Sequence, residues 1–71
     1  MITVNNHELP YAPGSVEHTL ELTLVDPRLS HLAGKECIVV RNGQPVARQD
    51  RGRTMVEDGD VFSIYVMQFG G

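Results

Sequence analysis

Apolar and polar residues alternate most clearly near the end of the chain, over residues 61–67. Successive side chains of a β-strand point to opposite faces, so this segment is predicted to be a strand with two different faces. One face is uniformly apolar and is expected to cover the core: Phe62, Ile64 and Val66. The other face mixes a serine with large apolar groups: Val61, Ser63, Tyr65, Met67 and Phe69.

The first residues predict a hairpin. Residues 1–4 favour a strand, and Asn5-Asn6 tolerates the positive φ of a tight turn. A returning strand is expected over residues 7–11, and Ala12-Pro13-Gly14 ends it.

The segment after this hairpin has two patterns. Val16, Leu20 and Leu24 recur every four residues, as on one face of a helix, and Ser15 is suited to cap its N-terminus. Residues 19–24 also alternate between polar and apolar, which favours a strand. A helix is the better prediction because, without it, nothing would cover the apolar face of the sheet.

The middle of the chain predicts a second hairpin. Residues 37–40 form a β-rich run that we expect to be a central strand, and Asn42-Gly43 is a strong signal for a tight turn. Pro45 donates no backbone hydrogen bond, so the returning strand over residues 44–46 should be short or at an edge.

The remaining segments are predicted to be connections. Asp26-Pro27 resembles the start of a short helical turn that Gly34 would end. Residues 47–54 are polar and are expected to form an irregular loop. Residues 57–60 are expected to form a turn. Catalytic carboxylate pairs need burial and opposed environments, which this turn is not expected to offer Asp58 and Asp60, so a structural role is predicted.

Length, charge and cysteine content narrow the class of protein. The 71 residues, 41% of them hydrophobic, have room for one small core, so a single domain over residues 1–71 is expected. Six lysine and arginine residues against nine acidic ones give a net charge of −3, which argues against binding nucleic acid. No segment approaches the ~20 apolar residues that cross a bilayer. The single cysteine, Cys37, excludes an internal disulfide and fits a reducing compartment, so we expect a cytoplasmic protein. We also expect the free protein to be a monomer.

The sequence ends in Gly70-Gly71. Glycine has no side chain, so we expect residues 68–71 to form a slender, flexible tail that can extend about 13 Å into another protein's active site. An unhindered carboxylate there can react with ATP to form an acyl-adenylate, which is reactive toward a sulfur donor or an amine. Taken alone, a Gly-Gly terminus also fits a frayed end of the chain.

In combination, these features resemble the ubiquitin-like sulfur carriers of the thiamine and molybdopterin pathways. The resemblance covers nearly the whole chain and rests on these segments: Ile2-Thr3-Val4, Gly14-Ser15-Val16, Val40-Arg41-Asn42-Gly43 with Val46 and Arg48, Asp58-Gly59-Asp60, and Gly70-Gly71. The stretch from Arg41 to Arg48 is closer to the thiamine-pathway carrier.

The resemblance implies an α+β fold of the β-grasp type, with a mixed sheet and one main helix packed on one face. It also implies that a ubiquitin-activating-type enzyme uses ATP to adenylate Gly71, with Gly70 as the neck. Sulfur from a cysteine-desulfurase relay then converts the terminus to a thiocarboxylate, which a synthase accepts, in the thiamine branch to build the thiazole ring. Such a carrier is a protein co-substrate rather than an enzyme and binds no cofactor itself.

Tyr65, Met67 and Phe69 are predicted to form an exposed apolar patch that docks the activating enzyme. The alternative is that a loop or the sheet itself covers these side chains. The choice depends on which face of the last strand is exposed.

Other chemistry-bearing residues have plainer explanations. The three histidines share no ligand-like spacing, so no metal site is expected: His7, His18 and His31. Cys37 opens an apolar strand and is expected to be a small buried hydrophobe rather than a nucleophile. The arginines of the polar loop are either solvated, which is the simpler expectation, or bind an acidic partner: Arg48, Arg51 and Arg53.

Three functions therefore stand at this point. The first is a sulfur carrier, in the thiamine pathway or in a molybdopterin or amino-acid pathway. The second is a ubiquitin-like modifier in which Gly71 forms an isopeptide bond with lysine. The third is a non-covalent β-grasp interaction module whose terminus has no chemical role.

Overall fold

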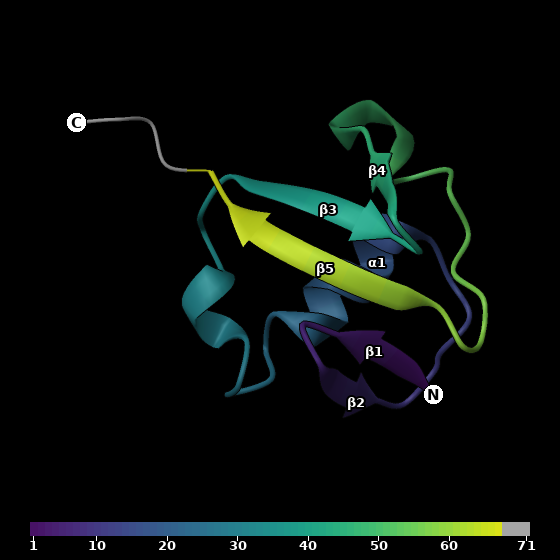
Figure 1. The fold of residues 1–71 in the computed structure, drawn as a ribbon, viewed down its shortest axis with the longest axis horizontal. Coiled ribbons are helices and arrows are strands. Elements are labelled where there is room, and N and C mark those ends of the chain that lie inside the picture. The colour runs from purple at the N-terminus through teal and green to yellow at the C-terminus, as the bar shows by residue number, and fades with distance from the viewer. Residues whose placement is uncertain (68–71) are drawn as a thin grey trace.

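The last strand of the chain lies in the middle of a five-stranded sheet (Figure 1). This is seen in a computed structural model of the protein, in which residues 1–67 are described. The sheet has the order β2-β1-β5-β3-β4 and consists of these strands: β1 (Ile2–Val4), β2 (His7–Leu9), β3 (Cys37–Arg41), β4 (Gln44–Val46) and β5 (Val61–Val66). The strand predicted as central, β3, is an interior strand, but the centre belongs to β5.

β5 pairs in parallel with β1 and antiparallel with β3. Parallel neighbours need a crossover connection, so the chain must leave the sheet between β1 and β5 and return. The helix α1 (Val16–Thr23) lies on this route and packs against one face of the sheet (Figure 1). A mixed sheet with one main helix across it is the predicted β-grasp arrangement, and that prediction is confirmed.

Both predicted hairpins are present, and each turns on asparagine. Asn5 and Asn6 have φ of 48° and 68°, and Asn42 and Gly43 have φ of 50° and 82°. Positive φ at both central residues gives a tight turn that matches the twist of the strands. The strand predicted over residues 7–11 ends earlier, at Leu9, because the next residue is a proline without a backbone N–H.

The two turn asparagines also bind the central strand through their side chains. The Asn5 carboxamide accepts from the Ile64 N–H at 2.7 Å and donates to the Ile64 carbonyl at 3.1 Å. The Asn42 side chain accepts from the Val61 N–H at 2.8 Å. The two asparagine side chains therefore bind backbone groups of β5 at positions beyond the ends of its neighbours β1 and β3.

The helix begins as predicted, with the Ser15 hydroxyl accepting from the His18 N–H at 3.2 Å. Val16 is fully buried, and Leu20 and Leu24 are half-buried against the core. Thr19 and Thr23 are buried as well, which the apolar pattern did not predict. The buried core lies between helix and sheet: Ile2, Val4, Leu9, Val16, Leu29, Leu32, Val39, Val56, Phe62 and Ile64.

Two connections contain 3₁₀ helices. The turn predicted at Asp26-Pro27 is present, since the Leu29 N–H donates to the Asp26 carbonyl at 2.9 Å, and a 3₁₀ helix follows (Ser30–Leu32). The prediction of an irregular loop over residues 47–54 was wrong in part. A 3₁₀ helix occupies Arg48–Asp50 and is closed by a bond from the Asp50 N–H to the Ala47 carbonyl at 2.9 Å.

The turn before β5 contains a buried carboxylate, contrary to the expectation that neither aspartate there would be buried. Asp60 is only 5% exposed. It accepts from Arg41 Nε at 2.8 Å, from Asn42 Nδ2 at 2.9 Å and from the Glu57 N–H at 2.8 Å. Burial by itself raises the pKa of Asp60, but these hydrogen bonds outweigh it, so the pKa lies below the ordinary value of 3.8. The predicted structural role therefore holds, and its basis is an ionised group that joins β5 to the β3–β4 hairpin.

Replacing Asp60 with asparagine should destabilise the fold. The substitution keeps the shape but removes the charge that Arg41 faces, so a loss of about 2 kcal/mol in the free energy of unfolding is expected. Urea unfolding measures it. Asp58→Asn is the matched control, since Asp58 is exposed and its carboxylate pairs with the chain's amino group at the surface, and it should cost less than about 0.5 kcal/mol. Equal losses for the two variants would contradict the role of Asp60.

The same network predicts how stability depends on pH. The pKa of Asp60 is lower in the folded than in the unfolded chain, so its contribution is present above the unfolded value and lost as pH falls below about 4. The wild type should therefore lose stability below about pH 4 more steeply than Asp60→Asn. Thermal unfolding at stepped pH measures both slopes, and parallel curves would show that Asp60 is not the titrating group.

Candidate functional site

The face of the sheet opposite the helix carries exposed apolar side chains. Tyr65 is 57% exposed and Met67 40% exposed, while Phe62 and Ile64 on the other face of β5 are buried. The predicted division of the strand into a core face and an open face is confirmed.

Strand pairing extends this surface beyond β5. Ile38 of β3 lies directly opposite Tyr65 and is 44% exposed. Val61, two positions before Ser63 on the same face, is 50% exposed. We refer to these four side chains as the exposed apolar face: Ile38, Val61, Tyr65 and Met67. Large side chains left in water in one region are typical of a protein-binding surface.

Sequence reasoning missed Ile38. It lies in a β-rich run, and its neighbour Val39 is buried, so alternation indicated that it faces away from the core. Only the register between β3 and β5 shows that it lies beside Tyr65.

A hollow of about 420 Å³ adjoins the exposed apolar face at the end of β5. Ile38 and Met67 line part of it, and its charged lining residues are Arg48, Arg51 and Glu36. The Arg51 guanidinium donates to the Cys37 carbonyl at 2.8 Å through Nη2, and Arg48 lies 3.6 Å from the Glu36 carboxylate. Arg48 is 70% exposed, and Arg53, which pairs with Asp50, is 74% exposed, so the expectation of solvated arginines is confirmed for these two. Arg51 differs, because its guanidinium is bound within the fold.

Cys37 is half-buried on β3. Its thiol lies 3.5 Å from the Lys35 carbonyl and 3.9 Å from the Leu32 carbonyl. The S–H group therefore has carbonyl acceptors within the fold. The thiol packs against the core from its edge instead of lying fully inside it.

Comparison with solved structures places this geometry among known proteins. The chain is similar to the crystal structure of thiamine biosynthesis protein ThiS from Geobacter metallireducens, with 26% identity, a TM-score of 0.71, and coverage of 99% of this chain and 97% of that one. The resemblance to the thiamine-pathway carriers is confirmed. An NMR solution structure of a thiamine biosynthesis protein from the same organism shares the fold, with 23% identity, a TM-score of 0.64, and coverage of 99% and 86%. No protein-family model and no curated protein sequence matches the chain.

In this ThiS-like chain, the described part ends just beyond β5. At the end of the described residues, the Met67 N–H donates a hydrogen bond to the Glu36 carbonyl at 2.8 Å, which holds the end of the strand against the segment before β3. The predicted docking residue Phe69 and the predicted reactive residues Gly70 and Gly71 lie outside the described residues.

Within residues 1–67, no three His, Cys, Asp or Glu side chains gather closely enough to hold a metal ion. Over the same residues, no helix has the length and apolar character needed to pass through a bilayer.

Proposed function

We propose that the protein is a sulfur carrier of the thiamine pathway. The observation that supports this most directly is the exposed apolar face on β5, the strand that leads to Gly70-Gly71, in a chain similar to ThiS along almost its full length. A sulfur carrier needs a surface that a partner enzyme can bind, next to a terminus that is slender enough to enter the enzyme's active site.

The proposed chemistry takes place at the Gly71 carboxylate in the active sites of partner proteins. In the first step a carboxylate oxygen attacks the α-phosphorus of ATP, and pyrophosphate leaves. In the second, the terminal sulfur of a persulfide from a cysteine-desulfurase relay attacks the acyl carbon and AMP leaves, which gives an acyl disulfide. A thiol of the partner proteins then attacks the persulfide's inner sulfur, so that a disulfide forms on the partner side and the thiocarboxylate is released on Gly71. The thiazole-forming synthase then takes the sulfur, so the carrier is recycled as a co-substrate and is not itself the catalyst.

The body of the protein has the complementary task of recognition. Tyr65 and Met67 would pack against the activating enzyme, and Ile38 would widen that contact from the neighbouring strand. The adjacent hollow with Arg48 and Arg51 would favour an acidic side chain of the partner at the edge of the contact. Residues 68–71 would then enter the active site, as glycine at positions 70 and 71 leaves no side chain to obstruct them.

Thiocarboxylate formation can be detected by intact mass spectrometry. After incubation with ATP, an activating enzyme and a sulfide source, the chain should gain the mass difference between sulfur and oxygen. A variant with one alanine added after Gly71 is the control and should gain none, because its carboxylate no longer follows the two glycines. A terminus that stays unmodified would refute the proposal and favour a non-covalent module, and lysine-linked adducts would favour a protein modifier.

Tyr65→Asp should impair activation without unfolding the protein. A charge placed at the centre of the docking surface is expected to lower kcat/KM for adenylation about 30-fold or more, the effect of losing one strong contact. Pyrophosphate exchange measures the rate, and Tm should stay within a few degrees of the wild type because Tyr65 is exposed. Met55→Asp is the matched control, since Met55 is 58% exposed but lies outside the sheet. Unchanged kinetics in Tyr65→Asp would contradict the docking role.

A further inference from the structure

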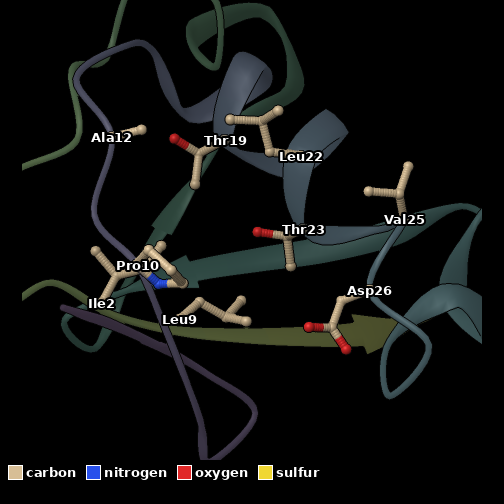
Figure 2. A pocket seen from close by; sticks show the side chains of 9 residues that line it. All are labelled: Ile2, Leu9, Pro10, Ala12, Thr19, Leu22, Thr23, Val25 and Asp26. Atoms are coloured by element: carbon tan, nitrogen blue, oxygen red, sulfur yellow. The ribbon is translucent and has the colours of Figure 1, made fainter.

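A second hollow lies on the helix side of the sheet, between α1 and the N-terminal hairpin (Figure 2). Its volume is about 340 Å³, and these residues line it: Ile2, Leu9, Pro10, Ala12, Thr19, Leu22, Thr23, Val25 and Asp26. We refer to it as the helix–hairpin groove. It is separate from the exposed apolar face, which lies on the other side of the sheet.

The walls of the groove are mostly aliphatic. Leu9 and Ile2 form its floor as part of the core, while Leu22 and Val25 stand at its rim and are 50% and 76% exposed. A cavity of about 150 Å³ with such walls suffices to hold benzene. The helix–hairpin groove is therefore large enough for a molecule of one to two rings, and filling it would remove the rim leucine and valine from water.

Two threonine hydroxyls give the groove a polar side. Thr19 and Thr23 lie one helical turn apart and are only 7% and 4% exposed. Figure 2 shows their oxygen atoms on the side of α1 that faces the hairpin. Neither hydroxyl makes a hydrogen bond to any atom of residues 1–67, whereas the Thr54 hydroxyl donates to the Asp50 carbonyl at 2.8 Å.

The two threonines place polar atoms where the core could be apolar. A valine of the same shape would fill either position with apolar atoms alone. The one buried side-chain nitrogen or oxygen in the described residues that is fully enclosed without a partner is Arg51 Nε. The threonine hydroxyls are therefore not sealed in the core but open into the groove, where a ligand can reach them.

The charge at the end of the groove limits the kind of ligand. The Asp26 carboxylate is bound by Arg28 through Nε at 3.1 Å, Nη2 at 3.0 Å and the backbone N–H at 2.9 Å. The side-chain hydrogen bond from Arg28 lowers the pKa of Asp26 to about 2, so this carboxylate stays ionised and paired. The Asp26–Arg28 pair has no net charge, so it offers neither an anionic nor a cationic ligand a free counter-charge.

We propose that the helix–hairpin groove binds a neutral small molecule of one to two rings, whose apolar body packs on Leu9 and Leu22. A hydroxyl, carbonyl or amide of the ligand would pair with the hydroxyls of Thr19 and Thr23. This site is independent of sulfur transfer, because it lies on the opposite side of the sheet from the exposed apolar face.

The test is a titration of the full chain, isotope-labelled for amide NMR, with benzyl alcohol as the probe. The amide resonances of Thr19, Leu22 and Thr23 in the protein should shift, and the shift should saturate as the benzyl alcohol concentration rises. The amide resonance of Tyr65 should stay in place. Toluene, which has the same ring without the hydroxyl, should bind more weakly, and benzoate and benzylammonium should not shift these resonances. Binding of the charged probes as tightly as the alcohol would overturn the proposal.

The double variant Thr19→Val with Thr23→Val keeps the size of both side chains and removes their hydroxyls. It should bind benzyl alcohol roughly fivefold more weakly, the loss that one hydrogen bond implies, with toluene binding unchanged. Leu22→Asp, at an exposed position, should abolish binding of both probes. If no probe shifts the groove resonances but the activating enzyme does, the small-molecule proposal is wrong and the groove is a protein-binding surface.

Discussion

The structure depends on a central strand that must satisfy both of its edges and both of its faces. β5 pairs in parallel with β1 on one edge and antiparallel with β3 on the other. Where the short neighbouring strands end, the side chains of Asn5 and Asn42 continue the pairing with β5 backbone groups. A strand buried at the centre of a small sheet cannot leave these groups unpaired, so the two hairpin turns serve the central strand as well as their own hairpins.

The two faces of β5 separate the core from the exposed apolar face. Phe62 and Ile64 pack toward α1, whereas Tyr65 and Met67 remain in water on the opposite side. A domain of this size has one core, so a docking surface can be built only from side chains that the core does not need. The alternation of a single strand provides both sets, and the carboxyl end of that strand leads directly to the glycines.

The charged groups follow a similar division between the ends of the molecule. Asp60 and the half-buried Arg41 form an ion pair where β5 begins, at the opposite end of the strand from Met67. The pair fixes the start of the strand at a distance from Tyr65 and Met67. The basic residues Arg48 and Arg51 lie instead beside Met67 and Ile38, at the rim of the exposed apolar face, where charge aids orientation.

The sequence by itself determined the local features of this protein: the two asparagine turns, the Ser15 cap, the edge position of the Pro45 strand and the two faces of residues 61–67. Each depends on the conformational preference of a few adjacent residues or on a period that is visible along the chain. The tertiary structure alone decided that Ile38 lies beside Tyr65, that Asp60 is buried, that β5 is central, and that two threonines open into a groove. These features depend on the register between segments up to 59 residues apart and on the packing of α1 against the sheet, which no local pattern encodes.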